Sequence, residues 1–358
     1  MNIKSIIKTT TFYNNLLETT FYRNYCEWHI LHKQRSLFYA EAKKRFQEEK
    51  PAHGSLEDYK SALYKHRVTY DEYMYRYDFW KLNESERNEF IANETMQKLY
   101  RIMGKPEVRQ LFCDKVEFLQ VYKDYIHRKW MYVKESTFEE FSEMLQQYDC
   151  IAKPQNKNSG EGIFKINRNE KCDLNALYLQ LKQDSYLVEE CIYACDEIAE
   201  FHPWSLNTIR VVTMSNNGQV RFIGAILRMG AHGSCVDNTH AGGVFASIDI
   251  DTGIIESDGV DTKDNRYVVH PDTKKQIKGF KIPEWEKIKA LCAKATTVFP
   301  NIYFAGWDLC VTRDGQIEII EGNFAPHFDG GMQVPMKRGV KRKVSEALVE
   351  LFHKKPLL

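Results

Sequence analysis

The 358-residue sequence lacks an excess of charge of either sign, because 50 lysines and arginines are balanced by 49 aspartates and glutamates. Proteins that hold nucleic acid or acidic membranes through a broad electrostatic field need a strongly basic surface. The balance excludes that class of protein. Any anionic ligand must therefore be bound by a local group of cations.

The sequence also lacks long apolar runs and closely paired cysteines. No stretch approaches the ~18 uninterrupted apolar residues of a membrane span, and residues 1–8 show neither the apolar core nor the cleavage site of a secretion signal. The nine cysteines form no Cys-x-x-Cys pair, which indicates reduced thiols rather than a disulfide framework or a zinc site. These absences predict a cytoplasmic protein.

Common nucleotide-binding motifs are missing as well. No GxxxxGKS/T loop is present, and Gly160-Glu161-Gly162 lacks the third glycine of a GxGxxG motif. There is no Asp-Phe-Gly, and His127-Arg128-Lys129 lacks the aspartate of a kinase catalytic loop. P-loop proteins and protein kinases are thereby excluded.

What is present changes in character along the chain. Residues from about 12 to 105 contain only Gly54 and Gly104 as glycines, and apolar positions such as Leu37, Ala42 and Phe46 recur at helical spacing. This region is predicted to be helical. Shorter helices are expected at 171–183, at 283–299 with Pro283 in the first turn, and at 334–352.

From about residue 150, short β-rich runs alternate with Gly, Asn and Asp. Strands are predicted at 163–166, 186–188, 208–214, 220–227, 244–250, 302–311 and 316–320. The joints Asn216-Asn217-Gly218 and Arg313-Asp314-Gly315 are typical of hairpins, because Asn, Asp and Gly tolerate the positive φ of tight turns. The pattern predicts an α+β fold with antiparallel sheet behind a helical N-terminal region.

A first candidate site begins at Lys153, at the end of a strand, and continues into the loop of residues 155–162. A lysine beside a loop that contains Ser159, Gly160 and Gly162 suits a polyphosphate, because small residues let backbone N–H groups approach the anion. The alternative is an ordinary glycine hairpin with solvated lysines.

A second candidate site lies at 187–192, where an apolar strand reaches Glu189 and Glu190. The backbone of an edge segment of this kind can hydrogen-bond an adenine, while a later carboxylate, Asp196 or Glu197, holds the ribose hydroxyls. Alternatively, the two glutamates merely end a strand.

A third candidate site joins two predicted strands. Asp308 lies in one of them, and Glu321 and Asn323 end the other, so a hairpin would bring all three together. Oxygen ligands with few charges suit Mg²⁺, which keeps waters and takes further ligands from phosphates. An ion pair with an arginine is the alternative. Arg210 and Arg228 lie in neighbouring apolar strands, where a guanidinium group requires a planar anionic partner, which a carboxylate or a phosphate supplies.

The ordered set of motifs resembles the ATP-grasp superfamily, and within it the sugar-transfer-associated branch. The resemblance covers about residues 114–339. It rests on the segments Asp114-Lys115, 153–162, 188–192, 205–213, 237–243, Asp308 and 321–323.

The resemblance implies an ATP-grasp fold, in which two subdomains, 111–195 and 196–358, hold ATP behind a helical region 1–110. Lys115 and Lys153 would contact the phosphates under the loop with Ser159, Gly160 and Gly162. For the nucleoside, the resemblance implies contacts of Glu189 with the adenine amino group, of the Glu190 and Ile192 backbone with the other edge of the adenine, and of Asp196 or Glu197 with the ribose. Arg210 and Arg228 would contact the γ-phosphate and the acyl phosphate. Asp308, Glu321 and Asn323 would bind one or two Mg²⁺. Asn238, His240 and His327 are candidates for the acceptor pocket.

The implied function is an ATP- and Mg²⁺-dependent carboxylate–amine ligase that works through an acyl phosphate. The branch suggests that it joins an amino acid or amine to a sugar or sugar acid in surface polysaccharide synthesis, with membrane-bound machinery as a partner. A phosphotransferase acting on a hydroxyl and a non-catalytic nucleotide-binding scaffold remain as alternatives. The sequence leaves the substrates, the oligomeric state and the purpose of the N-terminal helices open.

Overall fold

The computed structural model describes residues 20–157, 161–168, 172–234, 237, 242–324, 326–328 and 332–354, with side chains from residue 33 onward. The chain divides into two units, one of Met1–Asn83 with Ala92–Glu94 and one of Glu84–Ile91 with Thr95–Leu358. Each is described by itself.

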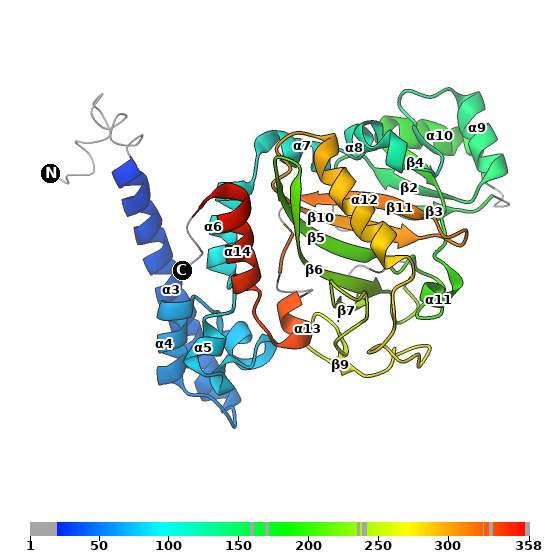
Figure 1. Ribbon diagram of the computed structural model, residues 1–358. Coiled ribbons are helices and arrows are strands. Elements are labelled where there is room, and N and C mark those ends of the chain that lie inside the picture. The colour runs from blue at the N-terminus through cyan, green and yellow to red at the C-terminus, as the bar shows by residue number, and fades with distance from the viewer. Residues whose placement is uncertain are drawn as a thin grey trace. The chain divides into compact units, whose positions relative to one another are not determined.

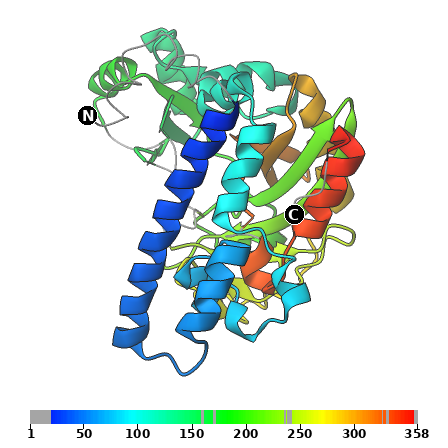
Figure 2. The same ribbon diagram turned by 90° about the vertical axis from the view of Figure 1, so that its left-hand side faces the viewer.

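The first unit is helical, as predicted. Helices α3 (Thr20–Glu49) and α4 (Leu56–His66) lie side by side and are followed by a π-helical turn (Glu72–Arg76) and a 3₁₀ turn (Phe79–Lys81) (Figures 1 and 2). The buried side chains are largely aromatic, and Tyr59 packs edge-on against Tyr73 with ring centroids 5.5 Å apart. The hydroxyls of Tyr70 and Tyr75 both donate to Glu49 Oε2. Many of the aromatic residues that mark this region in the sequence therefore form its own core.

The second unit contains a four-stranded antiparallel sheet of order β1-β4-β2-β3. Its strands are β1 (Trp130–Tyr132), β2 (Cys150–Pro154), β3 (Phe164–Ile166) and β4 (Tyr186–Glu190). Helices α9 (Phe138–Gln147) and α10 (Leu174–Gln183) pack on this sheet (Figure 1), where Phe141 and Leu181 join Val188 in one core. Thr137 and Glu140 form a capping box that starts α9.

A seven-stranded antiparallel sheet follows, of order β11-β10-β5-β6-β7-β8-β9. Its strands are β5 (Ile209–Asn216), β6 (Gln219–Met229), β7 (Val244–Ile248), β8 (Gly259–Val260), β9 (Arg266–Tyr267), β10 (Phe304–Val311) and β11 (Ile317–Phe324). Asn217 and Gly218, both with positive φ, join β5 to β6 as the hairpin signal predicted. The two sheets confirm the α+β class.

Helices cover both faces of the larger sheet (Figure 1). α12 (Trp285–Val298) packs on one face, within the main core. On the other face, α6 (Asn93–Met103) and α14 (Lys341–Phe352) enclose a second core around Phe304 and Phe328. The remaining helices are α5 (Glu84–Arg87), α7 (Pro106–Cys113), α8 (Lys115–Val121), α11 (Asp196–Ala199) and α13 (Val334–Met336).

Two predicted helix boundaries are wrong. Pro283 lies before the first turn of α12, because Glu284 adopts a left-handed conformation (φ 55°) and the helix begins at Trp285. The single helix expected at 334–352 is interrupted after α13, where Gly339 crosses the backbone of Glu89. A Cβ on Gly339 would lie 1.9 Å from the Glu89 carbonyl oxygen, so the close crossing requires glycine.

Two exclusions made from the sequence can be compared with the structure. Among the described residues, no helix combines the length and apolar character that crossing a membrane requires. The described cysteines Cys113, Cys150, Cys172, Cys191, Cys195, Cys292 and Cys310 are free thiols.

Trp307 should be a main determinant of stability. Its fully buried ring packs against Phe112 and Tyr122, and its Nε1 donates to Thr213 Oγ1 at 2.9 Å. We expect Trp307→Ala to lower the free energy of unfolding by about 3–5 kcal/mol, whereas the same change at the exposed Trp204 should stay within about 0.5 kcal/mol. Denaturant unfolding of both variants checks this, and equal effects would contradict it.

Candidate functional site

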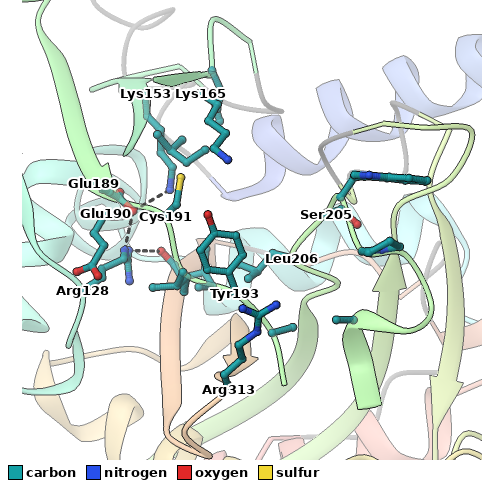
Figure 3. A pocket seen from close by; sticks show the side chains of 18 of the residues that line it. Arg128, Lys153, Lys165, Glu189, Glu190, Cys191, Tyr193, Ser205, Leu206 and Arg313 are labelled. Carbon is teal, nitrogen blue, oxygen red and sulfur yellow. Dashed lines mark hydrogen bonds and ion pairs between the residues drawn. The ribbon is translucent and has the colours of Figure 1, made fainter. Parts of the chain in front are cut away.

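A cavity of about 200 Å³ lies between the two sheets (Figure 3). The smaller sheet contributes Ile151 and Lys153 from β2, with Phe164 and Lys165 from β3. Ile320 of β11 belongs to the larger sheet, and residues 203–206 line the cavity as well. The cavity is therefore built by both sheets, so a ligand bound in it would touch both.

The segment after β4 forms another wall. The sequence suggested that β4 lies at a sheet edge, and this is wrong, because β1 adds an unpredicted strand outside it. The exposed backbone is instead that of the following residues, of which Cys191, Ile192 and Tyr193 line the cavity. The Glu190 amide is already bonded to the Lys129 carbonyl, and the Cys191 amide to the Asp149 carbonyl.

Glu189 is held by two cations at the base of this cavity. Its Oε2 accepts from Arg128 Nε at 2.6 Å and from Lys153 Nζ at 2.9 Å, and Figure 3 shows both cations converging on it. Burial alone would raise the pKa of Glu189, but the charges of Arg128 and Lys153 outweigh it and lower the pKa to about 2. Glu189 therefore stays ionised and fixed.

A second, smaller cavity adjoins the first and shares Lys153, Glu189 and Ile320 with it. Lys115 and Glu321 also line it, together with apolar side chains of α7 and α8. Asp114 caps α8 by accepting from the amides of residues 116 and 117, which places Lys115 in the first turn. Burial lowers the pKa of Lys115, and its Nζ donates to the Lys157 carbonyl.

The pairing of β5, β10 and β11 brings a third group of predicted site residues together. Glu321 of β11 lies opposite Asp308 of β10, which lies opposite Arg210 of β5. Asp308 is fully buried and receives two bonds from Arg210, at 2.6 and 2.7 Å, and one from Arg228 at 2.9 Å. Burial opposes ionisation of Asp308, but Arg210 and then Arg228 lower its pKa well below the usual range.

Glu321 is in the opposite electrostatic situation. Its side chain is 47% exposed, and its Oε1 is 4.0 Å from Arg210 Nη2. The protein atoms packed around the carboxyl, and then the negative charge of Asp308, raise its pKa despite that exposure. Asn323 Nδ2 donates to Asp308 at 3.1 Å and to Glu321 at 3.4 Å. Asp308, Glu321 and Asn323 therefore form one hydrogen-bonded group beside the guanidinium groups of Arg210 and Arg228.

The other predicted site residues are less closely associated. Ser159, Gly160, Asn238 and His240 lie outside the described residues. Gly162 has φ 75°, and its carbonyl accepts from Tyr186, which ties the loop end to β4. Asp196 and Glu197 are exposed on α11, and His327 is exposed and packs edge-on against Tyr100. The structure does not bring these last three into either cavity.

No role was assigned from the sequence to Arg128, Glu318 or Asp237, although Asp237 begins one of the segments that carry the family resemblance. Arg128 was considered only as part of a failed kinase motif, yet it pairs with both Glu189 and Glu318. Asp237 accepts from the Thr208 amide at 2.6 Å and lies 3.8 Å from Arg228. Glu318 could have been recognised, because an acidic residue inside the apolar run 317–320 requires a cationic partner when it is buried. The run itself does not identify that partner.

Comparison with known proteins gives a family match. The sequence matches the family described as sugar-transfer associated ATP-grasp over residues 96–347. No curated protein matches.

Solved structures with a similar arrangement include three ligases or synthetases. The ATP-grasp ligase PsnB, in complex with minimal precursor, Mg and ADP, is 14% identical, with a TM-score of 0.44 over 73% of this chain and 66% of that one. D-alanyl-alanine synthetase A from Vibrio cholerae is 11% identical (TM-score 0.40, 70% of this chain and 62% of that one). N5-carboxyaminoimidazole synthetase from Staphylococcus aureus with ADP is 14% identical (0.41, 70% and 60%). The chain thus spans less than two thirds of each of these proteins.

Asp308 and Glu321 should respond oppositely to loss of charge. Asp308→Asn leaves Arg210 and Arg228 without their buried partner, and we expect it to cost about 3–5 kcal/mol of unfolding free energy. Glu321→Gln removes repulsion from Asp308 and should be neutral or stabilising in metal-free buffer.

The pH dependence provides the control for this pair. Because the folded-state pKa of Glu321 is raised, the wild-type protein gains stability as pH falls through that pKa toward the ordinary value of 4.5. Any advantage of Glu321→Gln should therefore shrink over the same interval. Denaturant unfolding measured across pH tests this, and a clear loss of stability in Glu321→Gln at neutral pH would contradict it.

Proposed function

The chain belongs to the sugar-transfer associated ATP-grasp family and has the ATP-grasp fold, and from this premise we propose that it is an ATP- and Mg²⁺-dependent ligase that joins a carboxylate to an amine. The proposed substrates are a sugar or sugar acid and an amino acid or amine, used in surface polysaccharide synthesis. The observation that carries the proposal is the continuity of the two cavities with the acidic group on β10 and β11.

The two cavities suit the two ends of a nucleoside triphosphate. The larger has apolar walls and an exposed backbone segment at 191–193, which suit a base. The smaller is lined by Lys115 and Lys153 as well as Glu321, and the two lysines suit phosphates. Lys153 lines both, so the base and the phosphates would meet at this lysine.

The acidic group fits Mg²⁺. Within the described ranges no cluster of three or more His, Cys, Asp or Glu side chains could hold a metal. Two carboxylates and one amide are nevertheless sufficient for Mg²⁺, which keeps waters and shares phosphate oxygens. Glu321 lies opposite Asp308, and its pKa is raised first by the protein atoms packed around it and then by the charge of Asp308. Asp308, Glu321 and Asn323 are therefore the proposed ligands.

Arg210 and Arg228 are proposed to bind the transferring phosphoryl group. Both now donate to Asp308, and Arg210 occupies both of its oxygens. Oδ1 of Asp308 accepts one of these bonds and keeps further acceptor capacity, so Asp308 could hold Mg²⁺ while it bonds both arginines. The planar donors of the two guanidinium groups would match the oxygens of the phosphoryl group.

ATP with Mg²⁺ would supply the phosphoryl group that converts the carboxylate into an acyl phosphate, which the amine then attacks. The protein's part is to position the groups, stabilise charge and exclude water. Tyr186 ties the end of the 155–162 loop to β4, and Lys115 bonds the carbonyl of Lys157 in the same loop. The described residues at the two ends of this loop are thus each bonded to the rest of the unit.

A substrate matrix tests this function. Release of ADP is measured with Mg²⁺ and with candidate amino acids and sugar acids, singly and in pairs. The ligase predicts turnover that needs both an acid and an amine. Turnover with a hydroxyl acceptor alone would identify a phosphotransferase, and nucleotide binding without turnover under any mixture would identify a scaffold.

Glu321→Gln should lower turnover by about 10²-fold or more, since it removes charge stabilisation from the phosphoryl transfer. The expected neutral or positive effect on stability separates this loss from unfolding. Glu350→Gln is the matched control, because Glu350 is an exposed acid paired with Arg221 away from the cavities. Turnover within about tenfold of wild type in Glu321→Gln would contradict the metal assignment.

A further inference from the structure

Arg128 connects the two sheets through a fully buried guanidinium. Its Nε donates to Glu189 on β4 at 2.6 Å. Its Nη1 donates to Glu318 Oε1 on β11 at 2.7 Å. The same group also bonds two backbone carbonyls of β11, those of Ile319 at 2.8 Å and Ile320 at 3.2 Å. Only 2% of the Arg128 side chain is exposed.

Glu318 fixes the backbone of Arg128 in return. Its carboxylate accepts from the His127 amide at 3.0 and 3.1 Å, in addition to its bond with the Arg128 side chain. The segment before β1 and the strand β11 are therefore joined in both directions. Such a reciprocal arrangement restrains position and orientation together.

The carbonyls that Arg128 bonds lie at a β-bulge. Glu321 pairs with Asp308, but Ile319 pairs with Leu309, so Ile320 is an extra residue in β11. Side chains alternate between faces along a regular strand, and Glu318 and Glu321, three positions apart, would then point to opposite faces. The bulge places both on the face that carries Asp308.

We propose that Arg128 is a positioning residue that holds this bulge and thereby keeps Glu321 opposite Asp308. The inference rests on the proposed function, in which Glu321 holds Mg²⁺. The ladder is locally disrupted at a bulge, and the guanidinium supplies donors to the carbonyls there. Arg128 thus controls the geometry of the metal site without touching it.

Arg128 also leaves Lys153 free to move. Both cations bond the same oxygen of Glu189. If Lys153 turns toward a phosphate, Arg128 still neutralises the buried carboxylate, so the exchange does not leave an unpaired charge. The same guanidinium therefore serves the phosphate cavity on one side and the acidic group on the other.

Arg128→Lys tests the role, because lysine keeps the positive charge but cannot reproduce the fork that reaches Glu189, Glu318 and two carbonyls together. Binding of Mn²⁺, as a probe for Mg²⁺, is measured by titration calorimetry with ADP present. We expect about 10–100-fold weaker metal affinity, the effect usual for residues that orient metal ligands. ADP affinity without metal should fall by a smaller factor than metal affinity, because Arg128 is only one of the residues that line the larger cavity.

Arg221→Lys is the matched control, because Arg221 lies on β6 of the larger sheet and forms an exposed ion pair with Glu350 of α14. This variant should bind metal as the wild type does. If Arg128→Lys does not fold, Glu318→Gln decides, since it keeps the side-chain shape and weakens the bond to Arg128. Unchanged metal affinity in the folded variant overturns the positioning role alone. A wild-type protein that binds ADP but no Mn²⁺ contradicts the proposed function itself.

Discussion

The site depends on one constraint, which is that every charge between the two sheets must be neutralised where water cannot reach it. Asp308 meets the constraint with two arginines, and Glu189 meets it with Arg128 and Lys153. Glu321 differs from both, because its side chain is 47% exposed and its Oε1 lies 4.0 Å from Arg210 Nη2. It is the carboxylate of this group that we propose to meet a cation.

The same constraint applies to the two lysines that line the smaller cavity, Lys115 and Lys153. Among the described residues, the partners of Lys115 Nζ are the backbone carbonyls of Gln155 and Lys157, and burial lowers its pKa. Lys153 shares its carboxylate oxygen with a second cation. An anion with several negative charges would relieve both positions while a cation relieves Glu321. A nucleotide with its metal supplies both charges in one ligand.

The sequence was informative where a residue contradicts its surroundings. Asp308 and Glu321 interrupt apolar strands, and Asn217-Gly218 interrupts a β-rich run, so the meeting of the two acids and the turn could both be predicted from neighbouring residues. The partners were not predictable in this way. Arg128 lies 190 residues from Glu318, and no local pattern records such a pairing.

Local geometry that depends on distant packing was also beyond the sequence. The bulge at Ile320 occurs in a run of ordinary β-formers, without the glycine that often marks one. Three-residue β1 has too few residues for a periodic signal, and the break before α14 exists because Gly339 crosses Glu89. In each case tertiary contact, rather than local preference, determines the backbone.

The central claim is that the carboxylate is activated by phosphorylation, and oxygen transfer tests it most directly. A carboxylic acid substrate labelled with ¹⁸O is incubated with the protein, MgATP and the amine, and the released phosphate is analysed by mass spectrometry. Attack of the amine on an acyl phosphate expels phosphate that retains one carboxylate oxygen, so the account predicts one ¹⁸O per phosphate released. Unlabelled phosphate accompanying formation of the amide would contradict it.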